Sequence, residues 1–292
     1  MFCGTYTALV TPFKADGSLD TETFRRLVQL QVDAGIDGIV PVGTTGESPT
    51  LDYAEHAQVI EIAVEAAAGR IKVIAGTGSN STHEAIDLTR GALRAGADAT
   101  LQVTPYYNKP NQEGLYRHFM AVADLGLPVL LYNIPGRSGR EIEVDTLVRM
   151  ASHPQIAAVK ESAGSVERVS EILNRCPRLA VLSGDDPLTL PMMVVGASGV
   201  VSVASNVIPR EVAAMVRHAR QGRWEEARAL HARLYPLFRD LFIDTNPIPV
   251  KAAMEMLGLG EANYRLPLCP LADAKKARLR ETLRAVGVLQ GA

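Results

Sequence analysis

Short apolar runs alternate with longer amphipathic stretches along the chain up to residue 205. Eight runs rich in aliphatic and β-branched residues predict strands, at residues 5–10, 38–42, 72–75, 99–103, 129–132, 156–159, 179–182 and 199–203. The runs are continuously apolar rather than alternating, which is typical of parallel strands covered on both faces. Their starts lie roughly 20 to 34 residues apart, enough for one strand, one helix and two loops per repeat.

Amphipathic stretches between the runs predict helices, for example at residues 21–34, 53–68 and 82–95. In the first of them, Asp20 occupies the N-cap position and Phe24 and Leu27 belong to an apolar stripe. Eight strand-then-helix units favour a (β/α)8 barrel, the TIM barrel of the α/β class. An open doubly wound sheet is the alternative, but it needs about six strands and a break in the pattern, and no break occurs before residue 205.

The strand pattern ends near residue 209, and only helical segments follow, at residues 210–221, 223–242, 249–257 and 271–286. The last three exceed what a barrel requires. We therefore expect a barrel catalytic domain at residues 1–222 and a small C-terminal helical domain at residues 223–292, with Pro236 kinking the first helix of that domain.

Composition narrows the function classes. The 292 residues are 47% apolar and carry 30 Lys and Arg against 32 Asp and Glu, a net charge of −2, so no basic surface for nucleic acid or anionic lipid is expected. The sequence has neither a run of about 18 apolar residues nor a signal-peptide pattern. Cys3, Cys176 and Cys269 offer no disulfide framework and no zinc ribbon. These features predict a cytoplasmic protein.

Lys160 is the most informative polar residue, because the chemistry of a barrel collects at the carboxyl ends of its strands. It directly follows the apolar run 156–159, so its amine is expected to point into the barrel mouth. Burial disfavours the charged form of an amine, and a neutral amine is a nucleophile toward a carbonyl carbon. The alternative is a lysine that leaves the sheet for water, which is the commoner fate of a single lysine.

Other strand ends carry groups suited to an oxo acid. Tyr132 lies one strand before Lys160, where its phenol can shuttle a proton, although a core tyrosine is the more frequent case. Thr44 and Thr45 lie in a glycine-rich turn whose backbone amides can hold a carboxylate. Arg137 follows a Pro-Gly pair and offers a guanidinium for bidentate carboxylate binding, with an exposed loop arginine as the alternative.

Metal and nucleotide chemistry find less support. The six histidines show no HExxH spacing and none ends a predicted strand, and the chain has no GxGxxG or Walker pattern. Asp185 and Asp186 follow the seventh run, where they are suited either to a divalent ion or to capping the next helix. We therefore expect no dedicated metal site, and the strand-end groups favour imine chemistry on an oxo acid.

Five motifs occur in a fixed order along the chain: GTTGES at 43–48, TPYYNKP at 104–110, YNIPGR at 132–137, VKES at 159–162 and GDD at 184–186. With these motifs the chain resembles the pyruvate-dependent class I aldolases and lyases, and among them the 4-hydroxy-tetrahydrodipicolinate synthase family, formerly called dihydrodipicolinate synthase. The resemblance covers essentially the whole length. The motifs are specific together, whereas the GTTGE turn or the lysine alone would indicate only the wider superfamily.

The resemblance implies condensation of pyruvate with L-aspartate 4-semialdehyde to 4-hydroxy-tetrahydrodipicolinate, in diaminopimelate and lysine biosynthesis, without a cofactor. Lys160 would form the Schiff base with pyruvate, and Tyr132 would donate and accept the proton. The further residues implied are Thr44 and Tyr107 for a hydroxyl relay, Thr45 for the pyruvate carboxylate, Gly184 and Val201 for the pyruvate pocket through backbone groups, and Arg137 for the semialdehyde carboxylate.

The resemblance also bears on assembly and regulation. In the family Tyr107 reaches into a neighbouring subunit's site, which implies a dimer for full activity and a tetramer as the usual form. Feedback inhibition by L-lysine is implied at the dimer interface, although Tyr53 and Pro49 depart from the residues common in the family, and interface packing alone is the alternative. The regulatory residues would be Ser48, His56, Asn80, Glu84 and Tyr106.

Two other functions stay open on the sequence. N-acetylneuraminate lyases and sugar-acid aldolases share the lysine and the YNxP tyrosine, so a pyruvate-dependent aldolase for another small aldehyde is the enzyme alternative. Thr44 beside Thr45, the triplet at residues 106–108 and Arg137 favour the synthase. A binding or regulatory barrel without catalysis would be expected to lose Lys160, Tyr132 or Thr44, and all three are present.

Overall fold

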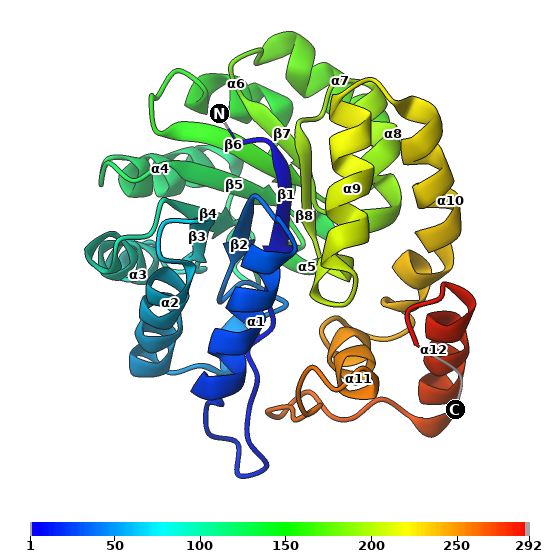
Figure 1. The fold of residues 1–292 in the computed structure, drawn as a ribbon. Helices are drawn as coiled ribbons and strands as arrows, with labels where there is room; N and C mark the ends of the chain where they lie inside the picture. Colours follow the sequence, from blue (N-terminus) through cyan, green and yellow to red (C-terminus); the bar gives the residue numbers. More distant parts are fainter. Residues whose placement is uncertain (1, 290–292) are drawn as a thin grey trace.

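A closed barrel of parallel strands forms the centre of the molecule in the computed structural model, which describes residues 2–289 (Figure 1). The strands pair in chain order, and β8 pairs with β1 to close the ring. This confirms the predicted TIM barrel over the open sheet. The strands are β1 Gly4–Ala8, β2 Gly38–Val40, β3 Lys72–Gly76, β4 Ala99–Val103, β5 Val129–Asn133, β6 Ile156–Glu161, β7 Ala180–Ser183 and β8 Gly199–Ser202.

Helices surround the barrel and cover the outer faces of its strands (Figure 1). Asp20 caps α1 as predicted, because its carboxylate accepts a hydrogen bond from the Thr23 amide. The helices of this layer are α1 Thr21–Asp33, α2 Tyr53–Ala67, α3 Thr82–Ala95, α4 Gln112–Ala123, α6 Val144–Met150, α7 Val166–Arg175, α8 Thr189–Val194 and α9 Pro209–Arg220. The short helix α5 Pro135–Ser138 follows the carboxyl end of β5, and the 3-10 turns η1 Ser48–Thr50, η2 Asp186–Leu188 and η3 Ala204–Asn206 follow those of β2, β7 and β8.

Three helices follow the barrel: α10 Trp224–Asp240, α11 Ile248–Met256 and α12 Asp273–Ala285. α10 continues through Pro236 as one helix and packs against α9 and α12. Residue 222 falls in the turn between α9 and α10, and the division into two domains there stays a prediction. Within residues 2–289, no helix combines the length and the apolar character that crossing a bilayer requires.

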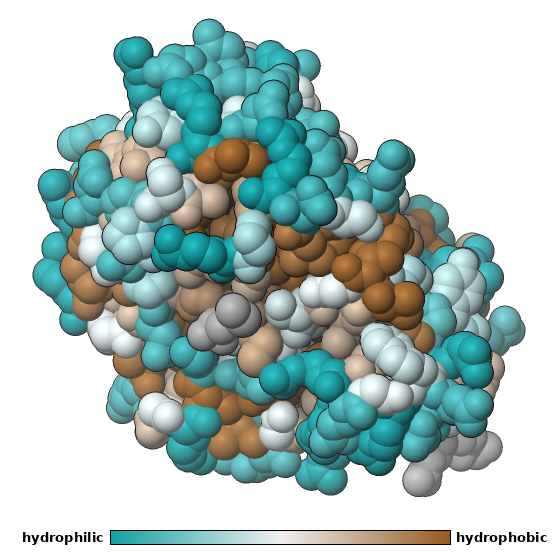
Figure 2. Space-filling model, turned by 90° about the horizontal axis from the view of Figure 1, so that it is seen from above, coloured by the Kyte–Doolittle hydropathy of each residue, from teal (hydrophilic) through white to brown (hydrophobic). Residues whose placement is uncertain are grey.

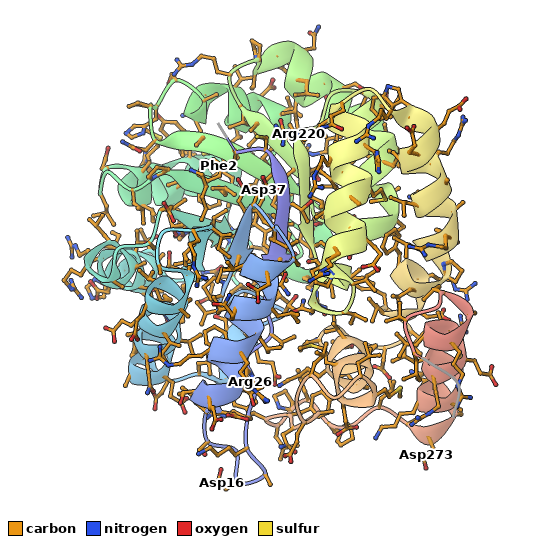
Figure 3. The ribbon with its side chains drawn as sticks, viewed as in Figure 1. Phe2, Asp16, Arg26, Asp37, Arg220 and Asp273 are labelled. Atoms are coloured by element: carbon orange, nitrogen blue, oxygen red, sulfur yellow. The ribbon has the colours of Figure 1, made fainter. Side chains whose placement is uncertain are left out.

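The two ends of the barrel differ in what they carry. At the amino-terminal end, Asp37 accepts a hydrogen bond from the Thr5 amide at 2.8 Å, and Figure 3 shows Phe2, Asp37 and Arg220 together at this end. The loop that holds Asp16 lies at the opposite end, on the same side as α11 and α12 (Figures 1 and 3). The carboxyl ends of the strands therefore face the C-terminal helices.

Candidate active site

Lys160 and Tyr132 lie side by side at the carboxyl ends of β6 and β5. The two residues are directly paired in the β5–β6 register, and the Nζ atom of Lys160 lies 3.9 Å from the centre of the Tyr132 ring. Each side chain is 5% exposed. The lysine therefore does not leave the sheet for water, and its amine lies against the ring of Tyr132.

Alternation along β6 explains why Lys160 points inward. Its neighbour Glu161 points out of the barrel, where its buried carboxylate accepts hydrogen bonds from Asn133 Nδ2 at 2.9 Å, from the Ala163 amide at 2.8 Å and from Arg168 Nε at 3.0 Å. A buried carboxylate with these partners is satisfied in place. Glu161 thereby fixes the strand end that carries Lys160.

Because Gly184 has no side chain, there is room beside it for the side chain of Lys160. A Cβ atom at this position would lie 1.9 Å from Ser162 Oγ and 2.9 Å from Lys160 Cε, so no residue with a side chain fits without displacing both. Ser162 Oγ is buried beside the lysine and has no hydrogen-bond partner among the described residues. The sequence reasoning assigned Gly184 to the pyruvate pocket and missed Ser162, although alternation after Lys160 places Ser162 on the inner face.

The GTTGE turn lies across the barrel mouth from Lys160, between β2 and η1. Val42 and Glu47, at its two ends, both have positive φ, of 51° and 54°. The buried carboxylate of Glu47 pairs with the ammonium of Lys251 on α11, a contact that ties the turn to the C-terminal helices. Thr45 is 3% exposed, and its Oγ1 accepts a hydrogen bond from Asn246 Nδ2 at 3.0 Å.

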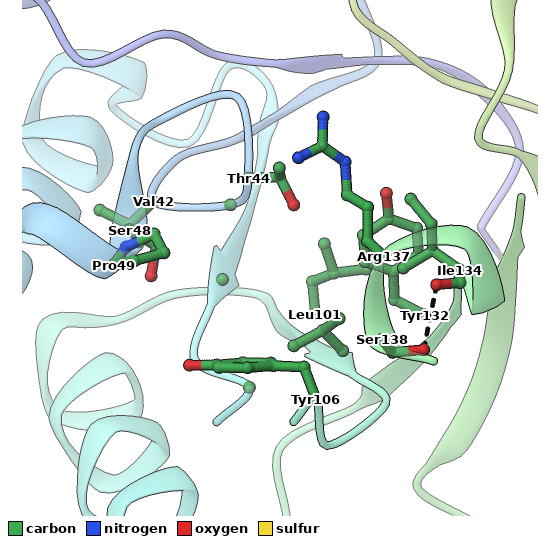
Figure 4. Close-up of a pocket in the computed structure, with 14 residues that line it drawn as sticks. Val42, Thr44, Ser48, Pro49, Leu101, Tyr106, Tyr132, Ile134, Arg137 and Ser138 are labelled. Atoms are coloured by element: carbon green, nitrogen blue, oxygen red, sulfur yellow. Dashed lines mark hydrogen bonds between the residues drawn. The ribbon is translucent and has the colours of Figure 1, made fainter. Parts of the chain in front are cut away.

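A cavity of about 200 Å³ lies at this mouth, and its lining joins the predicted residues Thr44, Tyr132 and Arg137 (Figure 4). The guanidinium of Arg137 extends toward the Thr44 side of the cavity and donates to the backbone oxygen of Asn246 at 3.1 Å. Arg137 is exposed at the opening. The cavity thus has hydroxyl groups inside and a cation at its rim, which suits a small carboxylate substrate.

Three predicted residues, Lys160, Thr45 and Gly184, are buried and do not themselves line the cavity. Two more, Tyr107 and Val201, are also outside its lining. Tyr107 is 90% exposed with a φ of 72°, and it does not line the cavity of its own chain. The relay from Thr44 to Tyr107 is therefore not assembled within one chain. Val201, on β8, is fully buried in the barrel.

A second cavity, of about 160 Å³, lies between the GTTGES segment, α2 and α3. Four of the five predicted regulatory residues line it, namely Ser48, His56, Glu84 and Tyr106. Pro49 and Tyr53, the two residues that depart from those common in the family, line it as well. Asn80 is not part of the lining, but its side chain donates to the Tyr106 backbone oxygen at 3.2 Å. Burial lowers the pKa of His56, whose Nε2 lies 2.9 Å from the Gly76 oxygen.

The two aspartates after β7 neither cap a helix through their side chains nor belong to a metal cluster. Asp186 is buried, and its carboxylate accepts hydrogen bonds from Ser202 Oγ and from the Val203 and Ala204 amides, so it holds the end of β8. Burial raises the pKa of Asp185 to about 6, against the opposing charge of Lys160. Among the described residues, no three His, Cys, Asp or Glu side chains gather as a metal site.

Asn246 was not predicted as a site residue, although it contacts both Thr45 and Arg137. It lies 201 residues after Thr45 in the loop between α10 and α11. Nothing in its local sequence indicates a catalytic role, because a polar loop residue next to a proline is common. Only the packing of the C-terminal helices against the barrel mouth brings it to the site.

A parallel barrel that holds a buried lysine on β6 against a tyrosine on β5 defines a class of enzymes, the lysine-dependent aldolases and lyases that act on oxo acids. The model of the dihydrodipicolinate synthetase family matches residues 1–286, and the chain belongs to this family.

Similar proteins cover the whole chain. It is 52% identical over 291 residues to a 4-hydroxy-tetrahydrodipicolinate synthase from Pelobacter propionicus, covering 99% of this chain and 100% of that one. The crystal structure of dihydrodipicolinate synthase from Aquifex aeolicus matches with a TM-score of 0.97 and 52% identity, covering 99% and 100% of the two chains. A structure of the enzyme from Cyanidioschyzon merolae with lysine bound matches with a TM-score of 0.96 and 43% identity, covering 99% of each chain.

Proposed function

We propose that this chain performs the family reaction with Lys160 as its nucleophile. The reaction condenses pyruvate with L-aspartate 4-semialdehyde to 4-hydroxy-tetrahydrodipicolinate, a lyase reaction of diaminopimelate and lysine biosynthesis. The observation that carries the assignment is the buried amine of Lys160, 3.9 Å from the Tyr132 ring centre at the cavity. Three free cysteines and a biosynthetic role support a cytoplasmic location.

The chemistry follows from the groups at the mouth. The Lys160 amine adds to the carbonyl carbon of pyruvate, and loss of water gives an imine. Removal of a methyl proton gives an enamine, which forms the new carbon–carbon bond with the aldehyde carbon and becomes an imine again. The amino group of the semialdehyde then adds to the imine carbon, the ring closes, and the Lys160 amine leaves. Tyr132, next to the amine, donates and accepts these protons, with Thr44 next in the relay.

Carboxylate binding divides between two ends of the cavity. Thr45 holds the carboxylate of pyruvate near Lys160, and Arg137 at the rim holds the carboxylate of the semialdehyde. Gly184 and Val201 line the pyruvate pocket through backbone groups. In this proposal the two carboxylates bind apart, with the two reacting carbons between them.

Trapping of the imine tests the assignment. Borohydride added to the protein with pyruvate is expected to reduce the imine and leave a covalent adduct on Lys160, detected by intact mass and peptide mapping. Lys160→Ala is expected to abolish the adduct. Tyr132→Phe is expected to form it slowly, with turnover reduced about 10²- to 10⁴-fold. An adduct on another residue, or full turnover by Lys160→Ala, would overturn the proposal.

We further propose that L-lysine binds in the second cavity and inhibits the enzyme. His56, Glu84 and Tyr106 offer an amino acid both hydrogen-bond partners and a negative charge for its ammonium groups. Ser48 and Pro49 line both this cavity and the catalytic one, so a ligand here contacts the segment that follows Thr44 and Thr45. The related structure with lysine bound supports the proposal.

Titration of L-lysine into a steady-state assay tests this regulation. We expect inhibition that weakens in Glu84→Gln, because the variant lacks the negative charge that faces the ligand. Exposed Glu65, on the far side of α2 in an ion pair with Arg25, provides the control variant Glu65→Gln. An unchanged rate at millimolar lysine would eliminate the proposal.

We also propose that the enzyme works as a dimer, with a tetramer as its usual form. Tyr107 projects from one chain with 90% of its surface exposed, which fits a residue that completes a neighbour's site. Other large apolar side chains are exposed as well, among them Tyr53 and Val194, and Figure 2 shows apolar groups gathered in patches on one face of the molecule. Such patches are typical of surfaces that bind another chain.

A further inference from the structure

The contacts of Asn246 connect the C-terminal helices to both carboxylate-binding residues of the site. Its Nδ2 donates to Thr45 Oγ1 at 3.0 Å, and its backbone oxygen accepts from Arg137 Nη2 at 3.1 Å. Asn246 is 6% exposed and lies directly before α11, the helix whose Lys251 pairs with Glu47 of the same turn. The segment from Asn246 to Lys251 therefore contacts the GTTGE turn at two points.

The direction of the Thr45 hydrogen bond has a chemical consequence. An amide NH2 group only donates, so it occupies a lone pair of Oγ1 and leaves the hydroxyl proton of Thr45 for another acceptor. Within residues 2–289, no protein acceptor receives that proton. A carboxylate that enters the site is an acceptor without a proton of its own, and it matches this free donor.

The amide oxygen of Asn246 indicates that stability alone does not explain this residue. Oδ1 is buried and accepts no hydrogen bond from the described part of the chain. An unpaired buried amide oxygen costs free energy of folding, and an apolar side chain of the same size would avoid this cost. A buried polar group that is left partly unpaired requires an explanation other than stability. In Asn246, the Nδ2 group of the same amide donates to the Thr45 hydroxyl, to which we assign the substrate carboxylate.

We propose that Asn246 is a positioning residue that turns the Thr45 hydroxyl proton toward the carboxylate of the oxo acid. The proposal rests on the proposed function, because it assigns Thr45 to that carboxylate. It gives the C-terminal helical segment a part in substrate binding, through one side chain. The contact to Arg137 comes from the backbone oxygen, so a change of the Asn246 side chain leaves that contact in place.

The substitutions Asn246→Ala and Asn246→Asp test the proposal. Alanine removes the donor. Aspartate keeps the shape but replaces the donor with an acceptor, which would draw the Thr45 proton away from the substrate and add a negative charge beside the carboxylate. We expect the pyruvate concentration that half-saturates borohydride trapping to rise about 10- to 100-fold in Asn246→Ala, and further in Asn246→Asp.

The split between kinetic constants separates positioning from a structural role. We expect KM for pyruvate to rise while KM for the semialdehyde stays near that of the wild type, since Arg137 keeps its backbone partner. Thr245→Ala is the control, because Thr245 is the exposed neighbour of Asn246 in the same loop. Thermal unfolding of each variant shows that it is folded. Wild-type pyruvate affinity in the isosteric Asn246→Asp would overturn the proposal, as would equal loss for both substrates.

A double-mutant cycle with Thr45→Val tests whether Asn246 acts through Thr45. We expect Asn246→Ala to have little further effect on pyruvate affinity once the Thr45 hydroxyl is gone, whereas independent roles would give additive losses and overturn the proposal. The experiment also separates the two levels of inference. Absence of a Lys160 adduct in the wild type would reject the proposed function, while a normal wild-type adduct with additive losses would reject only the role of Asn246.

Discussion

The neighbours of Lys160 restrict the direction in which its side chain can point. Glu161 turns outward to Arg168 and Asn133, the Tyr132 ring covers one side of the amine, and Gly184 leaves room on the other. A nucleophile must be held close to its attack geometry for the reaction to be fast, and these neighbours provide that restraint.

Gly184→Ala is the substitution that tests this packing. The added methyl group overlaps Ser162 Oγ at 1.9 Å and Lys160 Cε at 2.9 Å, so the lysine must shift. We expect kcat/KM for pyruvate to fall about 10²-fold, since a displacement of about 1 Å at a reacting group has effects of that size. Steady-state kinetics and the rate of borohydride trapping provide the measurement.

Gly91→Ala is the matched control for that experiment. Gly91 lies within α3, and a Cβ there meets nothing closer than an arginine nitrogen at 3.9 Å. This variant is expected to keep its activity, because alanine is a good helix former. A Gly184→Ala enzyme as active as Gly91→Ala would show that the close packing at Lys160 does not limit catalysis.

At the scale of elements, the buried carboxylate of Asp240 connects α10 to α12 through hydrogen bonds. Asp240 at the end of α10 accepts hydrogen bonds from Arg278 Nη2 at 2.6 Å and Thr282 Oγ1 at 2.7 Å, both on α12, and from Arg239 Nε at 2.7 Å. Burial alone would raise the pKa of Asp240, but these donors outweigh it and hold the pKa below its ordinary value. The hydrogen bonds between Asp240 and α12 therefore favour an ionised Asp240.

The pH dependence of stability tests this contact. Because the pKa of Asp240 is lower in the folded state, its contribution is complete above the unfolded value near pH 4 and is lost as the pH falls toward the folded value. Asp240→Asn is expected to lose roughly 1–3 kcal/mol of stability at pH 7. Thermal unfolding between pH 7 and pH 3 should show the difference from the wild type shrinking toward acid.

Asp244→Asn is the control for a carboxylate in the same region. Asp244 pairs with Lys275 at 2.6 Å, but both side chains are partly exposed, so its loss should cost less than about 1 kcal/mol. Equal effects of the two substitutions at pH 7 would mean that the buried contacts of Asp240 are not what holds α12 to α10.

At the scale of the whole molecule, the exposed Tyr107 leaves the proposed hydroxyl relay of one chain incomplete. If a second copy supplies this phenol, an active site combines Lys160 of one subunit with the tyrosine of another. Tyr107→Phe is then expected to lower turnover about 10²-fold while the Schiff base still forms. Size-exclusion chromatography is expected to show a dimer or a larger assembly.

Mixing an inactive variant, Lys160→Ala, with the impaired variant Tyr107→Phe provides the decisive measurement for this assembly. Lys160→Ala subunits carry an intact Tyr107, and Tyr107→Phe subunits carry an intact Lys160. After subunit exchange, mixed dimers contain one complete site, so activity should exceed that of either variant alone. No recovery despite demonstrated exchange, or a fully active monomer, would contradict the shared site.

The periodic pattern of apolar runs determined the barrel and most of the residues in its mouth. Each of the eight runs became a strand, and most ends differ from the prediction by one or two residues. Side chains alternate along a strand, and the carboxyl ends of parallel strands share one edge. Lys160 and Tyr132 were therefore placed together by local sequence alone.

Tertiary structure alone decided which distant segments complete the site. Asn246 reaches Thr45 across 201 residues, and Lys251 reaches Glu47 across 204, through contacts that no local pattern encodes. Such contacts depend on how the C-terminal helices pack over the barrel mouth, which is set by the sum of many apolar contacts and not by any single residue type. Periodicity thus located the amine of Lys160 that we propose as the nucleophile, and packing decided which distant residues hold the groups around it.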